Sequence, residues 1–244
     1  MINFICLKWG DKYDSSFVNR MHTMINRNCK VPFILHCCTE DPRDIIDIVN
    51  IIPLPEHYCL ETFWWKLWIT SNEFPIKDKC IFLDLDTVIQ NDLSDLIEYS
   101  PEDKLVILEA RWRHINRLPD MSHTNSSIIV WDSNKRDDII FDTFIKSSDC
   151  IMLKYPGNDD YTEQNFPELC ITLPHEWFYC RVWGYDDSDD NRYRYLIDPY
   201  HDVWGIDLVL YRMPERMICI FNGIRESEGI DSRIYQGFEH YWKD

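Results

Sequence analysis

The chain has few basic residues and no long hydrophobic run, and each shortage argues against a class of protein. Lys and Arg number 25 against 42 Asp and Glu, a net charge of −17. Binding to a nucleic-acid backbone depends on Lys and Arg that neutralise phosphates, so this balance argues against it. No apolar run approaches the roughly 20 residues of a membrane span. We therefore expect a soluble protein with neither a nucleic-acid partner nor a transmembrane segment.

The N-terminus and the cysteines indicate the compartment. The first residues, MINFICLKWGDKYD, lack the basic start and the small-residue cleavage site of a signal peptide. There are 10 cysteines, but several lie inside apolar, strand-like runs, where cysteine behaves as a small hydrophobic residue. The adjacent Cys37 and Cys38 do not form the spaced pair of a zinc site. These features favour a reduced, cytoplasmic protein.

The order of apolar segments predicts an α/β fold. Continuous β-rich runs at 2–7, 31–38, 80–84, 104–110, 126–132 and 217–223 read as buried strands, and apolar residues at helical spacing predict helices after Ser15, at 61–70 and at 136–148. This alternation favours a mostly parallel sheet covered by helices on both faces. After about residue 150 the pattern weakens. With 7 glycines and no linker, we expect one domain, whose second half carries substrate-shaping loops.

Two carboxylates follow the third predicted strand, in the segment FLDLDTVIQNDLSDL. Ligands of open α/β sheets bind at the carboxyl ends of strands. Side chains alternate along a strand, so Asp84 and Asp86 are expected on one side and Leu85 in the core. Paired carboxylates supply the hard oxygen ligands that Mg²⁺ or Mn²⁺ prefers. The residues alone leave a second interpretation open, in which the acids only cap a strand end.

The wider sequence resembles nucleotide-sugar glycosyltransferases of the GT-A fold, especially the glycogenin-like and galactosyltransferase-like family 8. Those proteins carry a strand, Asp-x-Asp, a short apolar pair and a following acidic-leucine segment. Further similar segments are CLKWGDKYDSSFVNRM, WWKLWI, TNSSIIVWD, TEQNFPEL and CIFNGIRE. The resemblance implies a Rossmann-like GT-A domain over 1–244, with a nucleotide-binding half at 1–110 and a sugar and acceptor half at 111–244.

The resemblance also implies a reaction and its residues. A UDP-sugar donor would pass its sugar, with retention, to a glycan, lipid or protein hydroxyl, assisted by Mn²⁺ or Mg²⁺. Asp84, Asp86 and Asn222 would bind the metal. Asn222 stands where the family has a histidine, and His201 and His240 are alternatives. The donor would contact Leu7, Trp9, Asp11, Tyr13, Lys66, Asp84, Leu85, Arg111, Ser126, Gly223 and Arg225. Asn125, Glu163 and Gln164 would lie at the transferred sugar as catalytic residues.

Two other functions compete with this interpretation. A haloacid dehalogenase-like phosphatase also uses Asp-x-Asp, with Asp84 as nucleophile. In that family the motif opens the fold, whereas here about a third of the chain precedes it, and no downstream Gly-Asp-x-x-x-Asp stretch is evident. A degenerate transferase fold retained for carbohydrate binding or assembly is the other alternative, suggested by the missing histidine.

Overall fold

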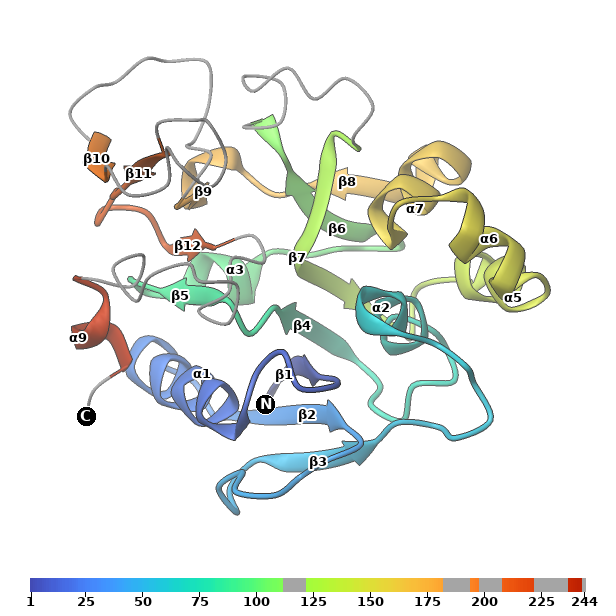
Figure 1. Ribbon diagram of the computed structural model, residues 1–244, viewed down its shortest axis with the longest axis horizontal. Helices are drawn as coiled ribbons and strands as arrows, with labels where there is room; N and C mark the ends of the chain where they lie inside the picture. The colour runs from blue at the N-terminus through green and yellow to red at the C-terminus, as the bar shows by residue number, and fades with distance from the viewer. Residues whose placement is uncertain (112–121, 182–193, 198–207, 222–236, 243–244) are drawn as a thin grey trace.

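A seven-stranded sheet forms the centre of the molecule. The computed structural model describes residues 1–111, 122–181, 194–197, 208–221 and 237–242. The strand order is β3-β2-β1-β4-β7-β6-β8. The strands are β1 (Ile2–Lys8), β2 (Phe33–Thr39), β3 (Asn50–Pro53), β4 (Lys79–Leu83), β6 (Leu105–Glu109), β7 (Thr124–Asp132) and β8 (Cys170–Thr172). Only β7 runs against its neighbours β4 and β6, and the other pairings within this sheet are parallel (Figure 1).

Two smaller sheets accompany the central one. One contains β5 (Thr87–Ile89), β12 (Ile218–Ile220) and β9 (Phe178–Cys180), with β12 in the middle, antiparallel to β5 and parallel to β9. The other pairs β10 (Arg194–Ile197) with β11 (Leu208–Tyr211). Because only three residues separate β4 from β5, the chain passes from the central sheet to the small one through a single short turn.

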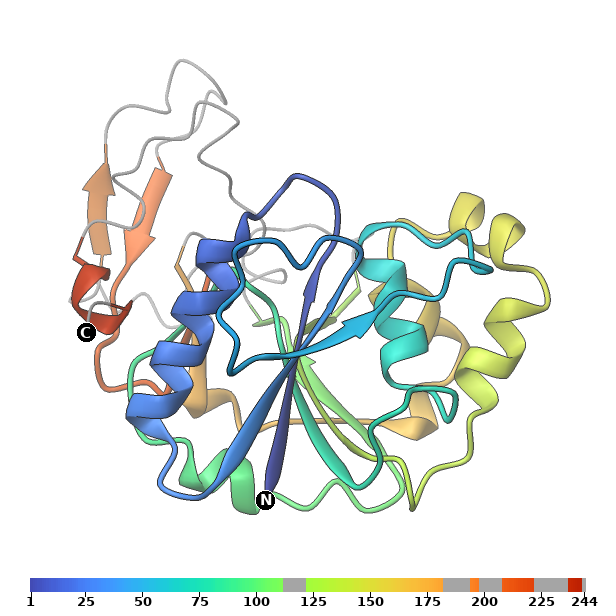
Figure 2. The same cartoon turned by 90° about the horizontal axis from the view of Figure 1, so that it is seen from below.

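Helices cover both faces of the central sheet (Figure 2). One face carries α1 (Ser15–Asn28), and the opposite face carries α2 (Trp65–Ile69), α5 (Ile139–Ile145) and α7 (Asn158–Asn165). The remaining helical segments are α3 (Ser94–Glu98), α6 (Ser148–Lys154), α9 (Glu239–Trp242) and the 3-10 turns Thr62–Trp64, Pro167–Leu169 and His175–Trp177. Strand alternation divides the core accordingly, since Phe4 and Cys6 pack on the α1 side while Ile5 packs on the α2 side.

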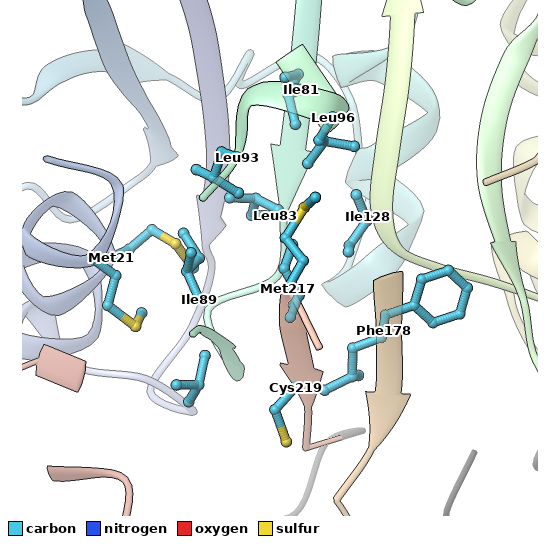
Figure 3. Close-up of a cluster of buried hydrophobic side chains, with 14 of the residues drawn as sticks. Met21, Ile81, Leu83, Ile89, Leu93, Leu96, Ile128, Phe178, Met217 and Cys219 are labelled. Atoms are coloured by element: carbon cyan, nitrogen blue, oxygen red, sulfur yellow. The ribbon is translucent and has the colours of Figure 1, made fainter. Parts of the chain in front are cut away.

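The α1-side core supports the turn between β4 and β5. Side chains from β4, β5, β7, β9, β12 and α1 converge there, and those labelled in Figure 3 include Met21, Leu83, Ile89, Ile128, Phe178 and Cys219. Each is at most 2% exposed. Burying one such aliphatic or aromatic side chain contributes roughly 1.5–3 kcal/mol to folding. The turn therefore lies directly on a close-packed core.

The structure confirms the predicted fold class, a mixed α/β fold with a mostly parallel sheet. The helix expected at 61–70 is a 3-10 turn, Thr62–Trp64, followed by the short α2, and the last strand is shorter than expected. The larger difference lies after residue 150, where α6 and α7 form in place of irregular chain. The buried side chains of α7 are Asn158, Asp160, Tyr161 and Thr162. Because three of these four are polar, α7 has no apolar stripe to reveal it in the sequence.

All ten cysteines lie in the described residues, and all are free thiols. Burial raises the pKa of the Cys80 and Cys170 thiols to about 12, so these behave as core residues, as their apolar neighbours predicted. Within the described part of the chain, no helix combines the length and the apolar character needed to cross a bilayer.

Candidate functional site

The Asp-Leu-Asp turn, residues 84–87, connects β4 to β5. The amide of Asp84 donates to the carbonyl of Ser127 on β7 at 2.9 Å. The amide and the hydroxyl of Thr87 both donate to the carbonyl of Asp84, at 3.1 and 2.7 Å. Leu85 is 5% exposed and joins the α1-side core, as predicted. However, β4 ends at Leu83, so the strand alternation used to predict the directions of the two carboxylates does not apply to this turn.

Asp84 forms an ion pair with Lys66 of α2. The ammonium Nζ lies 2.8 Å from each carboxylate oxygen of Asp84. The same Nζ donates to the carbonyl and the hydroxyl of Ser126, at 3.1 and 3.3 Å, and lies 5.1 Å from the centre of the Phe82 ring. Lys66 is 6% exposed, so an almost fully buried cation is held beside the turn by a carboxylate and two further oxygens.

Asp86 is held from the opposite side of the sheet. Its Oδ2 accepts a hydrogen bond from the Tyr13 hydroxyl at 3.1 Å, and its carbonyl accepts the amide of Phe221 at 3.0 Å. Asp86 is 6% exposed. Tyr13 belongs to the loop between β1 and α1, and its ring packs on Phe17 of α1 with 4.9 Å between ring centres. The two carboxylates thus contact different elements, α2 for Asp84 and the β1–α1 loop for Asp86.

The beginnings of β7 and α7 add polar groups next to Lys66. The side-chain carbonyl of Asn125 accepts the amide of Ser127 at 3.0 Å, and the Ser126 hydroxyl accepts the side-chain amide of Asn158 at 3.0 Å. Lys66, Ser126, Asn158 and Asp159 line a small hollow with room for about one water molecule. Its apolar walls include Leu105 and Ile107. Neither Asn158 nor Asp159 is among the residues predicted from the sequence. The only available signal was the run Asn-Asp-Asp after Gly157, where a helix begins.

Glu163, expected at the transferred sugar, is bonded to the start of β7. Its Oε2 accepts the hydroxyl of Ser122 at 2.6 Å and both the amide and the hydroxyl of Thr124 at 2.9 Å. Burial raises the pKa of Glu163, but the hydrogen bonds from Ser122 and Thr124 together with the nearby His123 outweigh it and hold that pKa below its ordinary value. Gln164 is exposed. Roles for both residues at a bound sugar remain predictions.

The other predicted contacts lie around the same end of the sheet or outside the described residues. Leu7 and Trp9 are half-buried and pack against the α2-side core, Asp11 is exposed, and Arg111 follows β6 and bonds Glu109 at 2.8 Å. Asn222, Gly223 and Arg225 lie outside the described residues, as does His201. His240 is described, in α9, exposed and 3.9 Å from the ring of Tyr241.

The donor set of the turn fits a hard divalent cation in part. Among the described residues, no three His, Cys, Asp or Glu side chains group closely enough to form a complete site. Asp84 and Asp86 supply two carboxylates, and Mg²⁺ usually binds through one or two carboxylates together with substrate phosphates and water. Asp84 and Asp86 are the carboxylates that the turn would offer to such a cation.

Comparison with known proteins gives structural matches only. No family profile and no curated protein sequence matches the chain. Among solved structures, the glycosyltransferase GlyE of Streptococcus pneumoniae TIGR4 is similar with a TM-score of 0.62 at 11% identity, over 100% of this chain. The chain spans 62% of the length of GlyE.

Two further structures are matched over nearly their whole length. The galactosyltransferase LgtC, solved with donor and acceptor sugar analogues, gives a TM-score of 0.61 at 12% identity, over 98% of this chain and 94% of LgtC. Mouse xyloside xylosyltransferase 1, in its apo form, gives 0.50 at 13% identity, over 91% of this chain and 97% of that enzyme. The fold of the chain is therefore the GT-A fold.

Proposed function

We propose that the protein transfers a sugar from a nucleotide sugar, a UDP-sugar, to an acceptor hydroxyl with retention at the anomeric carbon. The observation that carries this proposal is the Asp-Leu-Asp turn at the carboxyl end of β4, with the buried Lys66 ammonium 2.8 Å from Asp84. A diphosphate leaving group carries negative charge, which cations and fixed dipoles stabilise as it departs. The GT-A fold shared with glycosyltransferases supports the same chemistry.

In this proposal Asp84, Asp86 and Asn222 hold Mn²⁺ or Mg²⁺. When bound, the cation acts as a Lewis acid toward the diphosphate. Lys66 and Arg225 help to neutralise the phosphates. Leu7, Trp9, Asp11 and Tyr13 surround the base, and Leu85 and Gly223 bring backbone groups close to the nucleotide.

Residues on β6, β7 and α7 would receive the sugar. Asn125, Ser126 and Arg111 lie at the ends of β7 and β6, beside the hollow that Asn158 and Asp159 line. We add these last two residues to the sugar subsite because Asn158 donates to the Ser126 hydroxyl and Asp159 accepts from Asn158. Glu163 and Gln164 follow on the same helix. In this proposal the acceptor is a hydroxyl of a glycan, lipid or protein, and the location is cytoplasmic.

The test is release of UDP from a panel of UDP-sugars in the presence of Mn²⁺, for the wild type and for Asp86→Asn. The substitution keeps the shape of the side chain and removes its charge, so we expect release to fall by at least about 100-fold, the loss typical of removing one group that stabilises developing charge. Asp95→Asn is the matched control, because Asp95 is an exposed residue of α3. Equal rates for wild type and Asp86→Asn would contradict the proposal.

The same panel distinguishes the alternatives. Release of phosphate from sugar phosphates, independent of UDP, would favour a phosphatase that uses Asp84. A rise in melting temperature with UDP and Mn²⁺, without turnover of any donor, would favour a binding module, because a ligand specific for the native state raises its stability.

A further inference from the structure

We infer that Tyr13 is a positioning residue that couples nucleoside binding to metal binding. The inference rests on the proposed function, in which the β1–α1 loop contacts the base and Asp86 binds the metal. It adds that the two events favour each other through one hydrogen bond, from the Tyr13 hydroxyl to Oδ2 of Asp86 at 3.1 Å.

The geometry fixes Tyr13 at the junction between loop and helix. Its ring packs on Phe17, with 4.9 Å between ring centres, and Phe17 lies in the first turn of α1. The next residue, Asp14, caps α1 by accepting the amide of Ser16 at 2.9 Å. The helix therefore fixes the position of the Tyr13 hydroxyl. If the β1–α1 loop moves, this hydroxyl moves with it.

The rest of the loop is attached elsewhere. Gly10, at φ +63°, donates its amide to Glu40 at 2.6 Å, and Lys8 pairs with Asp41 at 3.6 Å. Both contacts reach the turn that follows β2, away from the Asp-Leu-Asp turn. Tyr13 provides a direct connection from the loop to the carboxylate proposed to bind the metal.

The acceptor chemistry permits a metal and the Tyr13 bond at once. A carboxylate has two oxygens with about four lone-pair positions, so Asp86 can accept the phenol and ligate a cation together. The 6% exposure of Asp86 makes the bond valuable, because a buried carboxylate is stabilised by each donor that orients it. A base that orders the loop would preorganise Asp86, and a cation that orders Asp86 would preorganise the loop. Such coupling is positive and reciprocal, with typical magnitudes of 5–150-fold in affinity.

The experiment measures Mn²⁺ affinity by the electron paramagnetic resonance signal of the free ion, with and without saturating uridine. Uridine carries no phosphate, so it has no phosphate oxygen with which to bind the metal. For the wild type we expect uridine to tighten Mn²⁺ binding about fivefold, the low end of typical coupling, and Mn²⁺ to tighten uridine binding by the same factor in calorimetry. Tyr13→Phe keeps the ring on Phe17 and removes the hydroxyl, so both factors should fall to about one.

Tyr58→Phe is the matched control. Its hydroxyl bonds Glu73, on the α2 side of the sheet, and we expect the fivefold factor to remain. Two outcomes would overturn the inference and leave the proposed function intact. One is wild-type protein that binds both ligands without coupling, and the other is full coupling in Tyr13→Phe. Wild-type protein that binds neither ligand would overturn the proposed function and the inference with it. Absence of coupling in the wild type overturns the inference whether or not Tyr13→Phe is stable.

Discussion

Replacing Lys66 by Met tests whether the Lys66–Asp84 pair is a buried structural element. Met keeps most of the apolar stem but removes the ammonium, and with it the donors to Asp84 and Ser126. Breaking one side of a buried ion pair typically costs 3–5 kcal/mol. The Lys66 side chain is 7% exposed and that of Asp84 is 26% exposed, so solvent screens part of the remaining charge. We therefore expect the free energy of unfolding to fall by about 2–3 kcal/mol.

The assay is urea unfolding followed by tryptophan fluorescence in the presence of EDTA. For a chain of this length the expected loss corresponds to a melting temperature lower by roughly 4–12 °C. Lys30→Met is the matched control, because Lys30 pairs with Asp92 while its side chain is 75% exposed, and such surface pairs contribute about 0–1 kcal/mol. If Lys66→Met costs no more than Lys30→Met, the pair is solvated and the electrostatic argument for the site is wrong. In the double variant with Asp84→Asn, the two losses should not add, because the partners share one interaction.

Two predictions concern pH. Burial lowers the pKa of His36 to about 4, so between that value and the ordinary 6.5 the unfolded chain binds a proton that the folded chain does not. The free energy of unfolding should fall by about 2–3 kcal/mol as the pH drops from about 6.5 to about 4, and His36→Gln should flatten this dependence in urea titrations. Burial raises the pKa of Asp138 to about 6. Between about pH 4 and 6 the folded chain therefore holds a proton on Asp138 that the unfolded chain has lost. The stabilisation from this proton is complete below pH 4 and is lost as the pH rises through about 6. Asp138→Asn keeps an acceptor for the amide of Asn72. It should raise the free energy of unfolding by about 1 kcal/mol at pH 7.5 and by about half as much at pH 5. An unchanged unfolding midpoint at pH 7.5 would contradict this.

The central sheet was predictable because its strands carry a strong local signal. The strands β1, β2 and β4 are runs of apolar residues without alternation, the pattern of strands covered on both faces. By contrast, α7 was not predictable from periodicity. Its buried polar residues bond to the start of β7, as in the pair from Asn158 to Ser126 at 3.0 Å and the bond from the amide of Ser122 to Asp160 at 3.0 Å. A helix whose buried face is polar has the same composition as a surface loop. Only its partners in the folded protein distinguish the two.

The position of the Asp-Leu-Asp turn after a strand was predictable, and its connections were not. Asp84 and Asp86 were found from their place after a strand, but their partners lie 18 and 73 residues away in the chain. No local pattern specifies that the lysine in a run of tryptophans will be buried, since its burial depends on meeting Asp84 and Ser126 in the folded protein. The turn also replaced the strand geometry expected at residues 84–86, because the Thr87 amide and hydroxyl both bond the carbonyl of Asp84.

These connections give the two carboxylates different electrostatic surroundings. Asp84 lies against a lysine ammonium at 2.8 Å. Asp86 accepts a hydrogen bond from the neutral Tyr13 phenol at 3.1 Å. An adjacent cation offsets the negative charge that attracts a metal, while a neutral donor orients a carboxylate without cancelling that charge. Because the Lys66 ammonium offsets the charge of Asp84, we expect Asp86 to contribute more of the attraction for a divalent cation, and Asp84 to hold Lys66 in place. If so, Asp86→Asn weakens Mn²⁺ binding more than Asp84→Asn does, and the opposite order would place the metal on the Lys66 side of the turn.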